Sequence, residues 1–226
     1  MGRGQSLFRS IKLETPEIER DVKRISCVLP FYKDGVGNIT KVLYTDGTLE
    51  ERLYSTDFWS SRFTKFHGES SHKMSWFSEH LGKYRNIPIP VGATILLPLK
   101  MRCRERVRGD GTIGYFMMDT ITQVIKSVYM QTLDAGYFDE YPDAKCAILL
   151  LDRFLVPCFQ AYQKVMASMN DGLAIQKLLQ DSRQEIAASR PLGRERDTRF
   201  RFDPGGFCAE GSAPYAGDLI KIPLPK

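Results

Sequence analysis

The sequence predicts an α+β fold, in which an antiparallel sheet of hairpins packs against helices and is followed by a disordered C-terminal tail. Three observations predict this fold: β-rich runs joined by Asp-Gly pairs, a helical spacing of apolar residues after residue 54, and a final stretch rich in Arg, Pro and Gly. We therefore expect an N-terminal arm over 1–24, a single domain over 25–189 and a flexible tail over 190–226.

The composition is that of a globular protein, with 42% hydrophobic and 26% charged residues. No run approaches the roughly 20 apolar residues that a membrane span needs. The five cysteines are scattered and form no CxxC pair, which favours reduced thiols. We expect a cytoplasmic protein with no membrane partner and no bound cofactor.

Residues 25–54 are predicted to form a three-stranded meander. The runs ISCVLPFY, ITKVLY and LEERLY are rich in β-branched and aromatic residues, and Asp-Gly pairs at 34 and 46 separate them. Glycine adopts positive φ without strain, so such pairs are strong hairpin signals.

Two helices are predicted next. Ser55 or Thr56 can cap a helix that ends near His67, and Ser70 or Ser71 can cap a second one that ends at Gly82. Apolar residues of the first helix recur at steps of three and four, which marks one buried face. These residues are Phe58, Trp59, Phe63 and Phe66.

The longest predicted strand, ATILLPLKMRCRERVR, covers residues 93–108 and pairs with TIGYFMM at 112–118. Pro98 predicts an edge position or a bulge. A two-residue loop would set Arg106 opposite Tyr115, and a three-residue loop would set Arg104 opposite Phe116. We prefer the second register, because the residues of the other strand face then pair apolar with apolar.

A cation stands at every second position of this strand, so a strand would place all of them on one face. They are Lys100, Arg102, Arg104, Arg106 and Arg108. With Glu105 as the one anion, residues 100–108 carry 5 − 1 = +4 of a total formal charge of +5. Cations can merely guard a sheet edge, but one or two lysines suffice for that. A row of arginines favours a polyanion such as DNA.

The second half of the chain is less regular. Residues 120–133 fit either a strand or a helix. CAILLL, at 146–151, is predicted to be a buried strand, followed by a helix from about Asp152 with Pro157 in its first turns. Another helix is expected from Asn170 or Asp171, with an apolar stripe that includes Leu178 and Ile186.

The motifs of common enzymes are absent, including the Walker A, HExxH and GxSxG patterns. The three histidines do not form an i, i+4 pair on one helix face. Asp143 and Asp152 flank the CAILLL strand and suggest a metal-dependent nuclease, but the lysine expected two residues after the second acid is missing. We do not expect an enzyme, and the nuclease stays as a lesser alternative.

Several short motifs occur in a characteristic order: SSRFTKFHG at 60–68, IPIPV at 87–91, ILLPL at 95–99 and GYF at 114–116. In this order the chain resembles the ComK competence transcription factors over about residues 55–165. The resemblance implies a bacterial cytoplasmic activator that binds A/T-rich DNA through the minor groove as a homo-oligomer. The resemblance also implies that the amount of the protein is controlled by proteolysis through an adaptor protein.

The sequence therefore predicts a DNA-binding transcriptional regulator of ComK-like type that contacts double-stranded DNA through its Arg-rich hairpin. Four further cations in or beside the two helices are secondary candidates for DNA contact: Arg62, Lys65, Lys83 and Arg85. The main alternative is a protein-interaction module whose basic face meets an acidic partner without binding DNA.

Overall fold

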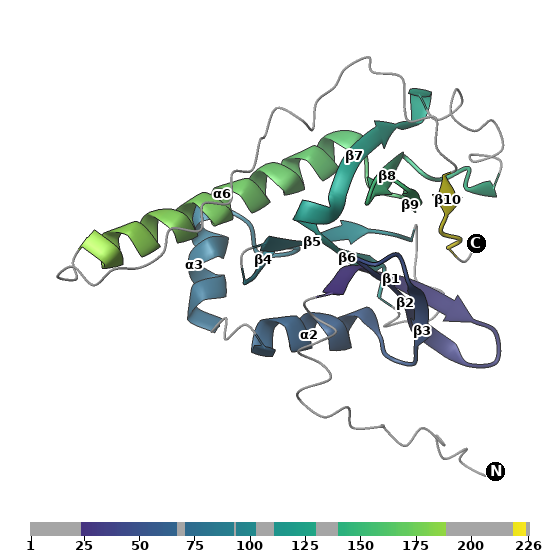
Figure 1. Cartoon of the computed structure of the whole chain (residues 1–226), viewed down its shortest axis with the longest axis horizontal. Helices are drawn as coiled ribbons and strands as arrows, with labels where there is room; N and C mark the ends of the chain where they lie inside the picture. Colours follow the sequence, from purple (N-terminus) through teal and green to yellow (C-terminus); the bar gives the residue numbers. More distant parts are fainter. Residues whose placement is uncertain are drawn as a thin grey trace, which may run out of the picture.

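The computed structural model describes residues 24–66, 71–92, 94–102, 111–129, 140–188 and 219–224. Within these ranges the chain forms a six-stranded sheet and a four-stranded sheet, with helices around them (Figure 1). The predicted α+β class is confirmed. The predicted N-terminal arm lies almost entirely outside the described residues.

The predicted meander is present as β1 (Ile25–Lys33), β2 (Gly37–Tyr44) and β3 (Leu49–Arg52). Gly35 and Gly47 have φ of 75° and 86°, so both Asp-Gly turns use the conformation that glycine tolerates. The six-stranded sheet continues from β1 in the order β3-β2-β1-β6-β5-β4. Its other strands are β4 (Ile89–Val91), β5 (Thr94–Lys100) and β6 (Ile113–Met117).

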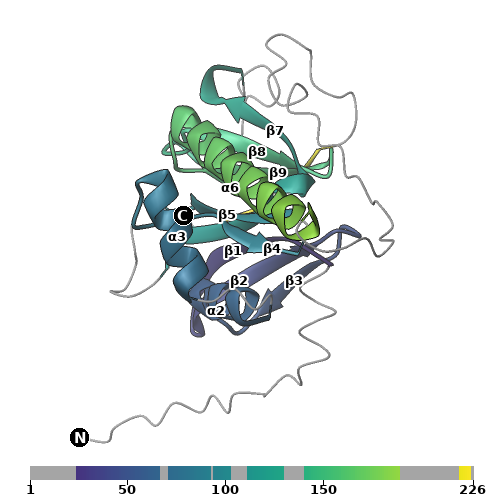
Figure 2. The same cartoon turned by 90° about the vertical axis from the view of Figure 1, so that its left-hand side faces the viewer.

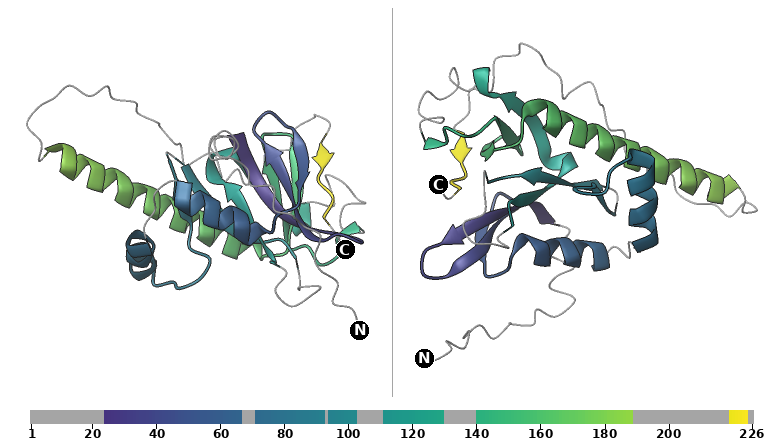
Figure 3. Two further views of the ribbon diagram at one scale, coloured as in Figure 1. Left: turned by 90° about the horizontal axis from the view of Figure 1, so that it is seen from below. Right: turned by 180° about the vertical axis from the view of Figure 1, so that it is seen from behind.

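Helices α2 (Thr56–Phe66) and α3 (Ser71–Leu81) occupy the positions that the sequence predicts. The backbone N–H of Phe58 donates to Ser55 Oγ at 3.3 Å, which identifies Ser55 as the cap. Trp59 and Phe63 are fully buried against the six-stranded sheet. Figure 3 shows α2 along one side of this sheet, with α6 on the other side.

The four-stranded sheet has the order β10-β9-β8-β7. Its strands are β7 (Ile121–Lys126), β8 (Cys146–Leu150), β9 (Phe154–Cys158) and β10 (Ile220–Lys221), and a short 3-10 turn, η1 (Met118–Thr120), leads into β7. The predicted strand at CAILLL is confirmed. The helix predicted from Asp152 is wrong, because residues 154–158 form β9 and pair antiparallel with β8.

One long helix, α6 (Tyr162–Ala188), follows β9. It begins eight residues before the predicted cap, so Asn170 and Asp171 lie inside the helix rather than at its start. Gly172 lies where α6 meets the sheet, because a Cβ there would come within 3.0 Å of Leu97. Figure 2 shows α6 in front of both sheets.

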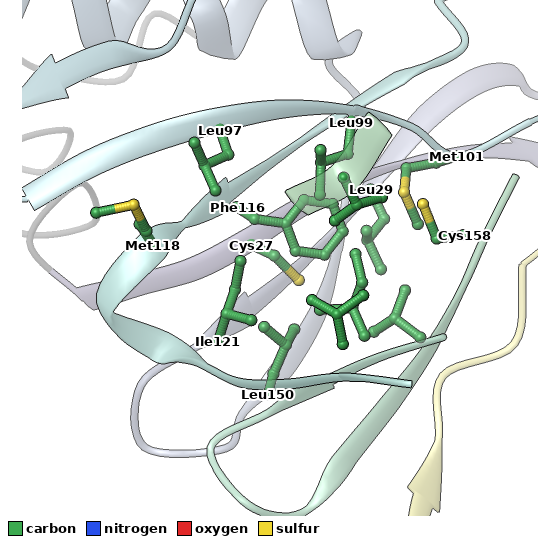
Figure 4. Packing of buried hydrophobic residues seen from close by; sticks show 14 of the residues in the cluster. Cys27, Leu29, Leu97, Leu99, Met101, Phe116, Met118, Ile121, Leu150 and Cys158 are labelled. Atoms are coloured by element: carbon green, nitrogen blue, oxygen red, sulfur yellow. The ribbon is translucent and has the colours of Figure 1, made fainter. Parts of the chain in front are cut away.

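The main core lies between the two sheets. Alternate residues of each central strand of the six-stranded sheet face opposite ways: Cys27 and Leu29 join the core between the sheets, whereas Val28 packs with Trp59 of α2. Leu97, Leu99 and Phe116 meet Leu150 and Cys158 of the other sheet in this core (Figure 4). Because both faces are covered, these strands read as continuous apolar runs.

Every proline within a described strand sits where its strand has one hydrogen-bonded neighbour. β6 pairs with β1 only at Cys27 and Val28, which leaves Pro30 with β2 alone. β4 reaches only Thr94–Leu96 of β5, so Pro98 has β6 alone. β10 pairs with residues 154 and 155, so Pro157 has β8 alone. The edge position predicted for Pro98 is therefore confirmed locally.

Residues 219–224 differ from the expectation for the tail. β10 pairs in parallel with β9, and Ile222 and Leu224 are buried in the main core. The end of the segment predicted to be flexible is thus part of the fold. Residues 189–218 lie outside the described residues.

Candidate nucleic-acid interface

The basic segment begins where the β5–β6 ladder ends. Lys100 pairs with Ile113, and the N–H of Met101 donates to the carbonyl of Thr112 at 2.8 Å. Residues 103–110, which carry Arg104, Arg106 and Arg108, connect the two strands and lie outside the described residues. The expectation that these arginines share a strand face therefore stays a prediction.

Both predicted registers for this hairpin are wrong. Phe116 pairs with Leu97 and Tyr115 pairs with Pro98, so neither aromatic residue lies opposite an arginine. In the observed register β6 pairs with the buried residues Leu96, Leu97 and Leu99 of β5, so the apolar part of the strand and not its basic part lies opposite the aromatic residues. The chain between the last ladder pairs is consequently longer than the tight turn that Asp110 and Gly111 suggested.

Tyr115 is buried rather than displayed among the arginines. Its ring lies on the α2 side of the sheet, and its hydroxyl forms a hydrogen bond with the Ser60 side chain. Burial raises the pKa of the Tyr115 hydroxyl, and the negative charge of Asp57 adds to the rise, although the Ser60 bond opposes it. Tyr115 thus holds α2 on the sheet.

Lys100 is anchored through its backbone on both sides. Its N–H donates to Gln160 Oε1 at 3.1 Å, and its carbonyl accepts from the N–H of Phe159 at 3.0 Å. The Cys158 thiol also lies 3.6 Å from this carbonyl oxygen. The four-stranded sheet and the segment before α6 therefore fix the start of the basic segment, while the Lys100 side chain is only half-buried.

Arg102 has a different environment from the one predicted. Its side chain is 6% exposed, and Nη2 donates to Asn38 Oδ1 at 3.0 Å, next to the turn between β1 and β2. A guanidinium that faces the protein in this way is not available to a phosphate. Arg102 ties the segment to the meander, and we do not retain it among the DNA contacts.

The other end of the basic segment returns against α2. A Cβ on Gly111 would lie 2.6 Å from Thr56 Oγ1, so the backbone passes close to the first residue of the helix. Arg62 and Lys65 are exposed on the same helix, and the Arg62 guanidinium lies 5.0 Å from the centre of the Phe58 ring. Six residues of α-helix, about 9 Å, separate Thr56 from Arg62. These two cations lie on the same side of the six-stranded sheet as the return point.

Lys83 and Arg85 do not join this group. Lys83 forms an ion pair with Asp171 of α6, which packs on the opposite face of β5. Arg85 is exposed two residues later, in the connection to β4. Of the secondary candidates, Arg62 and Lys65 thus share a helix with Thr56, which contacts Gly111, whereas Lys83 is paired with α6.

The carboxylates considered for a nuclease are kept apart by β8. Asp143 precedes this strand and Asp152 follows it. The span from Cys146 to Leu150 alone is about 13 Å at 3.3 Å per residue, whereas oxygen ligands of one metal lie about 2.0–2.6 Å from it. Over the described ranges, no cluster of His, Cys, Asp and Glu could hold a metal ion.

The sequence analysis missed one exposed aromatic group. Trp76 and His80 on α3 have ring centroids 4.6 Å apart, and Tyr84 in the following loop is 89% exposed. The i, i+4 spacing of Trp76 and His80 could have revealed the pair. Aromatic rings that are exposed to solvent can stack on bases. The neighbouring cation Lys83 forms an ion pair with Asp171, so it does not offer a phosphate contact beside these rings.

None of the helices in the described ranges combines the length and apolar character needed to cross a membrane. Scans against protein-family models, curated proteins and solved structures each found no match.

Proposed function

We propose that the chain is a sequence-preferring DNA-binding protein, a transcriptional regulator of ComK-like type, which contacts double-stranded DNA through Lys100, Arg104, Arg106 and Arg108. Arg62 and Lys65 of α2 assist. The observation that carries the proposal is the placement of five cations and one anion within residues 100–108. Arg102 is enclosed, and the neutralisation of phosphates by the other four cations would release condensed counterions and so favour binding.

The described ends of the segment support this role. Met101 and Arg102 are buried, and Gly111 abuts Thr56, so the segment leaves and returns to the folded domain at fixed points. A cationic segment held at both ends loses less conformational freedom on binding than a free tail. Arginine also suits narrow A/T-rich minor grooves, where the negative potential is enhanced.

The test is a titration of A/T-rich and G/C-rich duplexes at several salt concentrations. The proposal expects tighter binding to the A/T-rich duplex and a linear fall of log K with log salt. The double variant Arg104→Ala and Arg106→Ala should lower the steepness of this line by up to about 1.8, because each lost phosphate contact removes about 0.9.

Arg153→Ala is the matched control, because Arg153 is exposed in the turn before β9, at the opposite end of that strand from Phe159, which binds the Lys100 carbonyl. It should leave the salt dependence unchanged. A thermal melt verifies that each variant is folded. Absence of duplex binding at low salt, or a double variant that binds as the native chain does, would exclude the proposal. Binding to an acidic polypeptide but not to DNA would favour the protein-interaction alternative.

A further inference from the structure

The six residues 219–224 cover a surface, here called the groove, to which β9, Tyr141 and Lys41 contribute. β10 lies beside β9 at the edge of the four-stranded sheet (Figure 1). Tyr141 and Lys41, which belongs to β2 in the other sheet, also contact this segment. The groove therefore depends on contacts between distant parts of the sequence, since Lys41 and its partner Pro223 are 182 residues apart.

Hydrogen bonds hold the main chain of the segment at alternate residues, first to the β9 side and then to a side chain. Ile220 N–H donates to the Arg153 carbonyl at 2.9 Å, and Ile222 N–H donates to the Leu155 carbonyl at 3.0 Å. Leu224 N–H then donates to Tyr141 Oη at 3.0 Å, and the same hydroxyl lies 3.2 Å from the Leu224 carbonyl oxygen. This is the pattern by which an extended peptide adds a strand to an exposed sheet edge.

Side chains supply selectivity in alternation. Ile222 and Leu224 are 1% and 4% exposed and point into the main core, with Ile220 packed against it. Leu219 contacts the small apolar cluster on the other face of the four-stranded sheet, and the side chain of Pro223 is exposed. The groove thus accepts apolar residues at every second position.

A buried cation completes the groove. Lys41 is 7% exposed, its Nζ lies 3.9 Å from the centre of the Phe31 ring, and it donates to the Pro223 carbonyl at 3.2 Å. A charged group needs compensation when it is removed from water. The main-chain carbonyl of Pro223 provides part of that compensation. Proline has no N–H, but at an open sheet edge this N–H would have no strand to bind.

We propose that this groove is a peptide-binding site which takes an extended segment of the pattern apolar-x-apolar-x-apolar and is occupied here by the chain's own residues 220–224. The same peptide in trans exchanges with the native segment. DNA binding is not needed for the site, because its residues belong to β2, β9 and the segment at Tyr141 and not to residues 100–108.

The test uses the full chain with a recognition sequence for a site-specific protease inserted between Gly205 and Gly206. After cleavage, the C-terminal fragment should remain with the domain on size exclusion. A labelled synthetic peptide of residues 218–226 should then replace it. The same peptide with Ile222→Asp should compete at least tenfold less well, whereas Pro223→Ala, which changes an exposed side chain and keeps the carbonyl, should compete like the native peptide.

Circular dichroism and the thermal melt of the cleaved chain are followed in parallel. Loss of the fragment while the domain stays folded would overturn the proposal, as would a fragment that no concentration of peptide displaces. Unfolding on displacement would overturn it as well, because the segment would then be a fixed part of the core. Equal competition by the Ile222→Asp peptide would show that no apolar position is read.

Discussion

Burial decides what a single cation does in this protein. Arg62 and Arg102 are both arginines near the proposed interface, but Arg62 is exposed on α2 whereas Arg102 is enclosed and bonded to Asn38. The removal of an enclosed hydrogen-bonding group leaves a cavity and an acceptor that has lost its donor. The removal of an exposed one leaves neither.

Arg102→Ala should therefore destabilise the fold by about 1–3 kcal/mol, while Arg62→Ala should change stability by no more than about 0.5 kcal/mol. Urea denaturation with an unchanged slope measures the difference. Equal midpoints for the two variants would mean that the Arg102–Asn38 contact does not contribute.

The buried thiols link stability to alkaline pH. Burial raises the pKa of the Cys27 thiol far above its ordinary value of 9.0, although a hydrogen bond with the Leu43 backbone opposes the rise. The Cys146 thiol shifts in the same direction, through its hydrogen bond with Cys158 and through burial. In each case the folded state holds a proton that the unfolded chain releases above pH 9.

The stabilisation from Cys27 is thus complete below pH 9 and is lost as the pH rises above it, by about 1.4 kcal/mol per pH unit. Cys27→Ala should reduce the steepness of this loss between pH 9 and 10. Urea midpoints over that interval test the slope, which is independent of any general destabilisation by the smaller side chain. Parallel slopes for the native chain and the variant would contradict the assignment.

At the scale of elements, β6 is confined between two strands and admits no added atom at its centre. A Cβ on Gly114 would lie 2.6 Å from the Met101 side chain and 3.1 Å from the carbonyl oxygen of Val28. The second of these neighbours is backbone, so it cannot move without a shift of β1. Overpacking of this kind is destabilising.

Gly114→Ala should accordingly cost about 1–3 kcal/mol of unfolding free energy. Thr112→Ala is a suitable control, because it alters a partly buried side chain beside the same strand and leaves the Thr112 carbonyl that binds Met101. A thermal melt compares the two variants. The interpretation is wrong if Gly114→Ala melts with the native chain.

Local signals predicted the elements whose structure is decided locally. The meander followed from Asp-Gly turns, and α2 and α3 followed from caps and helical spacing. Residues 154–158 were misread, because a short apolar run does not distinguish strand from helix and Pro157 is compatible with either. Pro157 fits in β9 because β10 pairs with residues 154 and 155 and does not reach residue 157. The extent of β10 is a property of the tertiary structure.

The candidate site was predictable only in part, for the same reason. The sequence identifies the cations, but their environment depends on contacts between distant residues. Arg102 donates a hydrogen bond to Asn38, which lies 64 residues away, and Lys83 is paired with Asp171, which lies 88 residues away. The local sequence pattern around Arg102 or Lys83 does not predict such distant partners.

For the molecule as a whole, the two sheets share one core. Ile148 of β8 and Phe116 of β6 belong to the same buried cluster, as does Val165 of α6. Neither sheet has a separate core of that size, because the cluster under α2 and the outer cluster of the four-stranded sheet are smaller. The two sheets should therefore unfold together.

Ile148→Ala should lower global stability by about 2–5 kcal/mol. It should also weaken amide hydrogen-exchange protection in β2 of the other sheet as much as in β8 itself. Mass spectrometry of peptides from the two strands measures this. Reduced protection confined to the four-stranded sheet would show that the sheets are independent units.

The short pairing between β1 and β6 affects how fast the chain folds. Among the described residues, two ladder pairs join the two halves of the six-stranded sheet across almost ninety residues: Cys27 with Phe116 and Val28 with Tyr115. Each half is a local meander that can form early. Closing the long loop between the halves is entropically unfavourable until the core between the two sheets forms and offsets the cost. We therefore expect docking of the halves to limit the folding rate, and Val28→Ala to slow refolding more than it accelerates unfolding, as measured by stopped-flow refolding and unfolding in urea.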